Sequence, residues 1–405
     1  TAGFDSNAPS PNNYGIFINN NAQLTSTLGD LTLIGNATAG SNVSVGVTLL
    51  SGVISSADGT ISITGVGGDN TGSSNRGIWT SNGLSLQTTN TGNITLNGTG
   101  GNGGSSFNNG LFISGTSFQT LNGDISLTGI GGTTSFNGTY GIHYWNGANS
   151  ISTGTGNISL NGTGGSGTFS NNYGIYLNGL GATTNIGTGT ATRLQTNTGN
   201  ISVTGTGMGD GTTSQNYGLY FDNAVRLTAL GVTGDITLNG TGGNGTVANH
   251  GIYLRGFGNT ANTDAITLIE GNGGNINITG LGNGTFSNIY GVYLDNSAHV
   301  HNTGAGNITI TGTGANTSSS DGVYLKGIGV QTDTTFYTGT SIINGLLTLN
   351  GTATGSSAYG ILIDSGTELF SNGSGGITLS GQSTLSDGIF TSSSSINNVS
   401  PSKTM

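Results

Sequence analysis

Acidic side chains that lie close together in the sequence are the first candidates for chemistry in this chain. The nearest pairs are Asp264 with Glu270 and Asp364 with Glu368. A polysaccharide lyase or hydrolase needs carboxylates gathered as a calcium site or as an acid/base pair roughly 5 to 9.5 Å apart. The other acids are spread along the chain. We therefore expect both pairs to lie on solvated corners, and we predict a protein that is not an enzyme and has no catalytic residues.

Two histidines at His299 and His301 flank a single valine. Alternate residues of a strand point to the same face, and this spacing suits metal ligands. No third ligand lies nearby in the sequence. We expect exposed strand histidines, and we predict no metal site, no cofactor-binding residues and no cofactor.

Composition narrows the class of protein further. The 405 residues include 80 glycines, no cysteine, 5% charged residues and a net charge of −10. This charge argues against a nucleic-acid partner, because phosphates require a basic face. No apolar run reaches the roughly 18 to 20 residues of a membrane span, so we expect no membrane insertion. Helical periodicity is absent, which leaves strands as the elements that must position any functional side chain.

A short phrase headed by glycine recurs twelve times, as in residues 173–177 (Tyr-Gly-Ile-Tyr-Leu) and 290–294 (Tyr-Gly-Val-Tyr-Leu). Most copies follow one another at intervals of roughly 31 to 44 residues, and the last interval is 28, a range that marks a solenoid whose repeats bury their apolar faces against their neighbours. The glycines of this phrase, called motif glycines below, are Gly15, Gly46, Gly77, Gly110, Gly141, Gly174, Gly218, Gly251, Gly291, Gly322, Gly360 and Gly388.

Two further strand signals lie between the glycine-headed phrases. A second phrase, Gly-(Asn/Asp)-Ile-(Ser/Thr)-(Leu/Ile/Val), occurs at residues 92–96, 156–160 and 234–238, and a weaker third one at 84–86 and 151–153. All alternate apolar with polar residues, which is the period of a half-buried strand. Glycine and asparagine between them readily accept the positive φ of tight corners.

Three short strands and three corners per repeat predict an all-β, single-stranded parallel β-helix. We expect about twelve repeats in a solenoid domain over residues 1–396, followed by a tail at 397–405. A repeat of 31 residues is longer than three such short strands require, so two coils per repeat remain an alternative. The predicted inward columns contain Ile94, Leu96, Ile125, Leu127, Ile158, Leu160, Ile175, Leu177, Ile252 and Leu254.

Five charged residues, four positions after successive motif glycines, alternate in sign. If consecutive repeats are adjacent coils, every charge in this ladder has neighbours of opposite sign at a strand spacing of ~4.8 Å. Duplication of a two-repeat unit would also copy the alternation, because long and short repeats alternate after residue 174. The charge ladder consists of Asp222, Arg255, Asp295, Lys326 and Asp364.

Aromatic residues recur two positions after the motif glycine, where side chains should point outward. Such a stripe is suited to stacking on sugar rings, to burial against a second rod, or to stabilising its own coils as a cross-strand ladder, and the sequence leaves these three roles open. The predicted stripe comprises Phe17, Trp79, Phe112, Tyr176, Tyr220, Tyr253, Tyr293 and Tyr324, with Thr48, His143, Leu362 and Phe390 at the equivalent positions of the other repeats.

Two phrases carry a family resemblance. Gly-Asn-Ile-Thr-Leu-Asn-Gly-Thr-Gly-Gly at 92–101 and Asn-Asn-Tyr-Gly-Ile-Tyr-Leu at 171–177 resemble the repeats of large bacterial surface exoproteins, the filamentous-haemagglutinin-like and autotransporter-type adhesins. The resemblance implies a right-handed parallel β-helix that is secreted to the cell surface and serves in adhesion or matrix building.

The function expected from these observations is structural. We predict an extracellular β-solenoid, either a surface adhesin or the subunit of a self-assembling fibre, and self-association as its main interaction. Cell-surface glycans are the other candidate partner, and a carbohydrate-binding or polysaccharide-processing β-helix is the alternative function.

The chain begins without an initiator methionine or a signal peptide, so we expect a processed chain or a piece of a longer one. Extra residues in the long repeats that begin near 174, 251 and 322 predict a rib along one side.

Overall fold

The structure is a computed structural model of the 405-residue chain. It describes residues 12–39, 43–69, 71–103, 106–134, 138–179, 191–257, 266–327, 338–342, 345–364, 366–372, 375–392 and 394–399. The rib expected from the long repeats falls on residues 180–190, 258–265 and 328–337, which lie outside these ranges.

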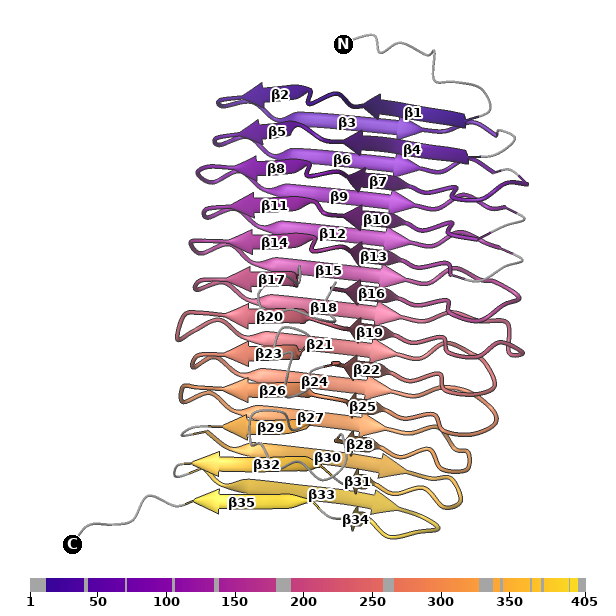
Figure 1. The fold of residues 1–405 in the computed structure, drawn as a ribbon, viewed down its shortest axis with the longest axis vertical. Coiled ribbons are helices and arrows are strands. Elements are labelled where there is room, and N and C mark those ends of the chain that lie inside the picture. Colours follow the sequence, from indigo (N-terminus) through magenta and orange to yellow (C-terminus); the bar gives the residue numbers. More distant parts are fainter. Residues whose placement is uncertain are drawn as a thin grey trace, which may run out of the picture.

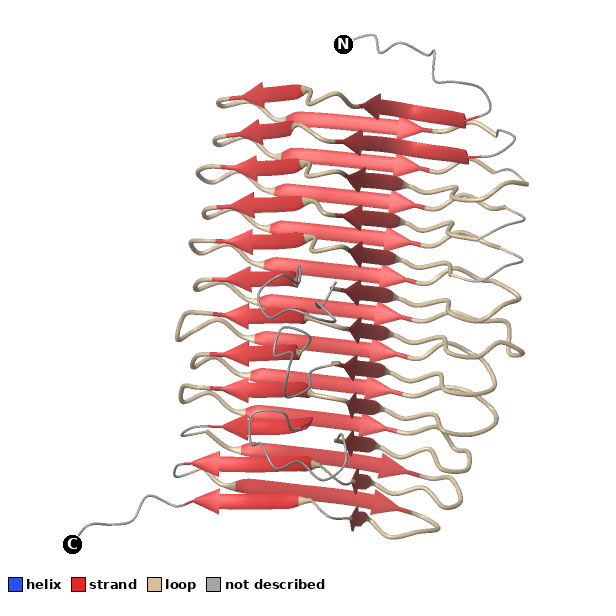
Figure 2. Cartoon of the chain, in the orientation of Figure 1, coloured by secondary structure: helices blue, strands red, loops and turns tan. Residues whose placement is uncertain are grey.

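The described residues form three parallel sheets stacked along one long axis (Figure 1). In each sheet the hydrogen-bonded neighbours are three strands apart in chain order, so every repeat contributes one strand to each sheet. Figure 2 shows strands joined by loops throughout these residues. The predicted all-β parallel β-helix is confirmed, and each repeat is one coil.

Sheet A is built from the glycine-headed phrase and has 12 strands. They are β1 (Asn12–Ile18), β4 (Val43–Leu50), β7 (Ile78–Ser81), β10 (Leu111–Ser114), β13 (Ile142–Trp145), β16 (Ile175–Asn178), β19 (Leu219–Asp222), β22 (Ile252–Arg255), β25 (Val292–Asp295), β28 (Val323–Lys326), β31 (Ile361–Ile363) and β34 (Ile389–Thr391).

Sheet B contains the third, weaker strand signal and also has 12 strands. They are β2 (Gln23–Ser26), β5 (Val53–Ser56), β8 (Ser85–Thr88), β11 (Ser117–Thr120), β14 (Asn149–Ser152), β17 (Thr192–Thr196), β20 (Val225–Ala229), β23 (Thr267–Gly271), β26 (Ala298–Asn302), β29 (Thr338–Ile342), β32 (Thr367–Asn372) and β35 (Ser395–Val399).

Sheet C is built from the second phrase and has 11 strands. They are β3 (Leu31–Asn36), β6 (Ile61–Val66), β9 (Ile94–Thr99), β12 (Ile125–Ile130), β15 (Ile158–Thr163), β18 (Ile201–Thr206), β21 (Ile236–Thr241), β24 (Ile276–Leu281), β27 (Ile308–Thr313), β30 (Leu347–Ala353) and β33 (Ile377–Ser383).

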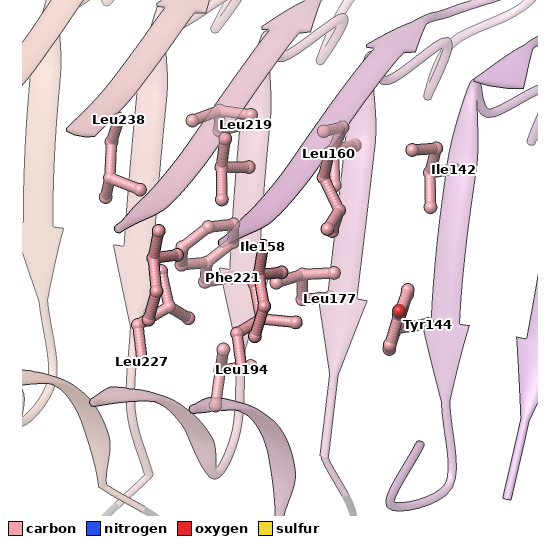
Figure 3. Packing of buried hydrophobic residues seen from close by; sticks show 14 of the residues in the cluster. Ile142, Tyr144, Ile158, Leu160, Leu177, Leu194, Leu219, Phe221, Leu227 and Leu238 are labelled. Atoms are coloured by element: carbon pink, nitrogen blue, oxygen red, sulfur yellow. The ribbon is translucent and has the colours of Figure 1, made fainter. Parts of the chain in front are cut away.

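Apolar columns fill the space between the sheets. Ile158 pairs in register with Ile125 on one side and Ile201 on the other, so identical side chains stack from coil to coil. Figure 3 shows Ile158 and Leu160 of sheet C packed with residues of the other two sheets, among them Leu177 and Leu194. All ten side chains predicted to point inward are buried, with at most 1% of their surface exposed.

The motif glycines lie where the backbones of sheets A and C approach each other closely. A Cβ atom added at Gly162 in sheet C would lie 2.3 Å from the carbonyl oxygen of the motif glycine Gly174. The same close approach of sheet C to sheet A recurs at Gly205 with Gly218 and in the other coils. These positions require glycine because two backbones touch. Positive φ angles lie in the corners, both between sheets A and B and three residues before the motif glycine, as at Asn171 with a φ of 70°.

The corner between sheets A and B is a tight turn of left-handed residues. Asn82 and Gly83 have φ angles of 60° and 75°, and Asn223 and Ala224 have 56° and 60°. Asparagine and glycine accept this conformation most readily, which explains their frequency at this corner.

The C-terminal boundary of the solenoid lies beyond the predicted one at residue 396. Strand β35 pairs with β32 as far as Val399, which is opposite Asn372. The expected tail at 397–405 is therefore corrected, because backbone pairing with the preceding coil continues into it. Within the described residues, no helix is long and apolar enough to cross a membrane.

Candidate functional site

The predicted aromatic stripe forms a stack on sheet A. Tyr176, Tyr220, Tyr253, Tyr293 and Tyr324 pair in register on successive strands. Their ring centroids are 4.8 to 5.0 Å apart, and neighbouring rings are within 13° of parallel. We call these residues the strand column.

A second aromatic column runs beside the first and was missed by the sequence analysis. It is formed by the residues directly before the motif glycines: Tyr140, Tyr173, Tyr217, His250 and Tyr290. Neighbouring rings stack at 4.8 to 5.1 Å. We call these residues the pre-glycine column. The signal was present, because tyrosine precedes glycine in several of the clearest phrases.

The two columns meet edge to face. Tyr217 lies 5.2 Å from Tyr220 with an angle of 66° between the rings, and Tyr290 lies at the same distance from Tyr293 at 64°. Aromatic rings favour both arrangements, offset stacking within a column and edge-to-face contact between columns. The result is a continuous herringbone of rings along the rod.

In the N-terminal half the predicted aromatic stripe is less regular than the strand column. Trp79 and Phe112 meet edge to face at 6.5 Å, and the Arg76 guanidinium lies 4.1 Å from the centre of the Phe112 ring. Burial lowers the pKa of Arg76 to about 10, so this cation remains charged over the ring at neutral pH. Phe17 contacts Tyr14 and keeps 37% of its surface exposed.

Exposure distinguishes the roles considered for the stripe. Tyr220 and Tyr293 expose only 8% and 9% of their surface, and Tyr176, Tyr253 and Tyr324 are half-buried. Most of the surface of these rings is therefore covered, in part by the neighbouring rings of the two columns. Of the three roles considered, the structure shows the contacts of a cross-strand aromatic ladder.

Burial keeps the titratable rings neutral. It raises the pKa of Tyr140 to about 12 and raises that of Tyr173 well above its usual value. It lowers the pKa of His143 and of His250 to about 3. Neutral His250 accepts a hydrogen bond at Nδ1 from the backbone N–H of Tyr290, at 3.0 Å, and so links two coils.

The charge ladder stands in the predicted register. Arg255 pairs with Asp222 on one side and with Asp295 on the other, and Asp295 pairs with Lys326. Asp364 directly follows Ile363, the partner of Leu325. Adjacent coils therefore carry opposite charges at this corner, as the alternation predicted.

Tyrosine hydroxyls form hydrogen bonds with charged side chains of the ladder. Tyr253 donates a hydrogen bond to Asp295 Oδ2 at 3.1 Å, and Tyr324 donates one to Asp364 Oδ2 at 3.2 Å. The Arg255 guanidinium, 3.9 Å from the Asp222 carboxylate, also donates to a tyrosine of the strand column. The ladder is therefore bonded to the aromatic column beside it.

Burial disfavours the charged form of two carboxylates of the ladder. Loss of solvent raises the pKa of Asp222, and the nearby Arg255 offsets part of the rise. Burial likewise raises the pKa of Asp295, against the opposing effects of Lys326 and the tyrosine hydroxyls. Because desolvation offsets the attraction between such charges, we expect these pairs to specify which coils are adjacent rather than to add much stability.

A second polar ladder occupies the corner before sheet C. The Oδ1 atom of Asp124 accepts the backbone N–H of Asn157 at 2.7 Å, and Asn157 in turn accepts that of Asn200 at 2.8 Å. Asp30 and Asp235 make the same contact to their following coils. These carboxylates thus satisfy the backbone of the rod.

The structure brings one candidate acid next to one candidate histidine. Glu270 lies beside His301 on sheet B. Burial lowers the pKa of His299 to about 4, with a smaller effect from His301. Asp264 lies outside the described residues. Across the described ranges, no group of three or more histidine, aspartate or glutamate side chains is placed to hold a metal ion.

Comparisons with known proteins give no match: no protein-family model, no curated protein and no solved structure matches this chain. The resemblance to surface exoprotein repeats therefore remains a prediction from the quoted phrases.

Proposed function

We propose that the chain is a non-catalytic, extracellular structural rod, and that it serves as a stalk of a surface adhesin or as the subunit of a fibre. The observation that carries the proposal is the register: one coil per repeat is kept in all three sheets from end to end. A rod of this kind offers length and regular, repeating faces.

The use of the polar side chains supports a structural role. A glycan-processing enzyme must keep carboxylates free to reach its substrate. Here Asp124 and Asp235 accept hydrogen bonds from the backbone of the next coil, and Asp295 accepts one from Tyr253. These groups hold coils together.

The ends of the described rod support assembly along its axis. The outermost strands of each sheet have one strand neighbour, and such edges can pair with a further strand. Ile16 and Leu24 at one end, and Ile377 and Leu379 at the other, are only partly buried although they continue the core columns. A further coil, from this chain or from a second copy, would bury them.

Electron microscopy and light scattering over a range of protein concentrations test this proposal. We expect rods that lengthen with concentration. Leu379→Lys places a charge in the half-buried end column and should stop growth, whereas Ser380→Lys, on the exposed face of the same strand, should not. Discrete rods of one length at every concentration would exclude self-assembly, and degradation of a polysaccharide by the purified chain would exclude a non-catalytic role.

A further inference from the structure

Two arginines lie side by side on the outer face of sheet B. Arg193 of β17 pairs directly with Arg226 of β20, and both alternate with buried leucines, so they point away from the core. Figure 1 shows β17 and β20 as adjacent strands. The chain has only six basic residues, so this pairing concentrates a third of them at one place.

The pairing breaks the rule that the charge ladder on sheet A obeys. Like charges directly opposite each other on neighbouring strands are destabilising, and the strand spacing is only ~4.8 Å. Among the described residues, neither arginine has a carboxylate within the 4 Å of an ion pair. The Nε atom of Arg226 is shielded from solvent and has no hydrogen-bond partner in that part of the structure.

The nearest outward acid on the next strand of the sheet is Glu270, which is diagonal to Arg226 and directly beside His301. The charge on Glu270 raises the pKa of His301 against the larger, opposite effect of burial. The arginine pair therefore presents two guanidinium groups whose repulsion an added anion would relieve.

We propose that Arg193 and Arg226 form a binding site for a polysaccharide that carries carboxylate or sulfate groups and lies along the rod axis. Guanidinium groups bind such anions through two parallel N–H···O bonds. The outward neighbours Asn149, Gln195 and Thr228 add amide and hydroxyl groups that suit sugar hydroxyls. The inference deepens the proposed function, since it assigns the adhesin rod a class of glycan.

Charge decides between a polysaccharide and other polyanions. A nucleic acid or an anionic membrane needs an extended basic surface. The arginine pair is isolated on a chain of net charge −10, and the strand neighbours of the pair carry Asn149 and Leu268 at the same outward column. Two adjacent cations are enough to bind two carboxylate or sulfate groups of a polysaccharide, whereas binding to a duplex or a membrane depends on many more basic contacts.

The test measures binding of the whole chain to polygalacturonate and dextran sulfate, with neutral dextran and duplex DNA as comparisons. We expect binding to one or both of the anionic polysaccharides, weakening as salt is raised, and none to neutral dextran. The variant Arg193→Gln with Arg226→Gln should lose at least about tenfold in affinity, because hydrogen bonds to charged groups are strong. Its melting temperature should stay equal or rise, since the repulsion is removed.

The matched control changes the net charge equally on another face. Ser202→Asp with Asn277→Asp lies on the outward face of sheet C, where both side chains are half-buried, and should leave affinity within about twofold, because charges on a different face are screened by salt. Equal loss in both variants, no loss in the arginine variant, no binding to either anionic polysaccharide, or equal binding to DNA would overturn the inference. Fibre growth is followed on the same samples, so intact growth without glycan binding would remove this inference and leave the proposed function standing.

Discussion

The hydroxyl of Tyr253 donates a hydrogen bond to Asp295 on the neighbouring strand, at 3.1 Å. This contact helps to join the aromatic herringbone to the charge ladder, because Tyr253 stacks between Tyr220 and Tyr293 while Asp295 lies between Arg255 and Lys326. Two features that the sequence presents as separate columns are therefore one cross-coil network.

The first prediction tests that network. Tyr253→Phe should keep the stack and lower the free energy of unfolding by about 1 to 3 kcal/mol, because it deprives a buried carboxylate of a donor. Urea unfolding of Tyr253→Phe, Asp295→Asn and the double variant forms a double-mutant cycle. We expect a coupling of at least about 0.5 kcal/mol between the two positions. Strictly additive losses would show that the contact contributes nothing.

The second prediction concerns the contact between Gly162 and Gly174. Gly162→Ala should destabilise the rod by about 1 to 3 kcal/mol, because the added methyl group would overlap a carbonyl oxygen of the adjacent sheet. Gly29→Ala is the matched control, since its new Cβ would meet only a serine hydroxyl at 3.4 Å. Thermal unfolding of both variants tests this prediction. Equal melting temperatures would contradict the close approach of the two backbones.

Much of this architecture was predictable because a solenoid repeats one local pattern. The inward columns follow from alternation in single phrases such as residues 156–160, and the register of the charge ladder follows from counting four residues past each motif glycine. Local periodicity and fixed spacing determine both, whatever the length of the loops between coils.

Other features depend on contacts between sheets, which spacing does not reveal. The distance between Gly162 and Gly174 is set by the approach of sheet C to sheet A. The sequence showed glycine at both positions but not that the two backbones touch. Tyr173 precedes its strand, and its place beside Tyr176 became evident only from the path of the chain into sheet A. The adjacency of Arg193 and Arg226 likewise required the register of sheet B.

The third prediction tests the core. Ile158→Asp should cost about 4 kcal/mol or more, because it leaves an unpaired charge among fully buried side chains. Since stability is a sum over neighbouring coils, the rod should then unfold in two separate transitions. Ser159→Asp, on the exposed side of the same strand, should change stability by no more than about 0.5 kcal/mol. Calorimetry that shows a single, unshifted transition for Ile158→Asp would rule out the inward column.

The last prediction concerns acid. The pKa of His250 is about 3 in the rod, against the ordinary histidine value of 6.5 in the unfolded chain. A base whose pKa is depressed by folding contributes stability that is present above pH 6.5 and is lost as the pH falls toward 3. Between pH 7 and pH 4.5, His250 alone should therefore cost about 2 to 3 kcal/mol.

His250→Asn removes this titration and keeps an acceptor for the next coil, as Asn109 does for Tyr140. The loss of stability between pH 7 and pH 4.5 should become smaller by that amount. Asp321→Asn should have the opposite effect. Burial raises the pKa of Asp321 to about 6, so acidification from pH 7 to pH 4.5 stabilises the rod at this site by about 2 kcal/mol. The variant lacks this stabilisation, so its loss of stability between the two pH values should be larger. Urea unfolding of both variants at the two pH values checks the signs. If the two variants shift the acid dependence in the same direction, the burial of one of these side chains is wrong.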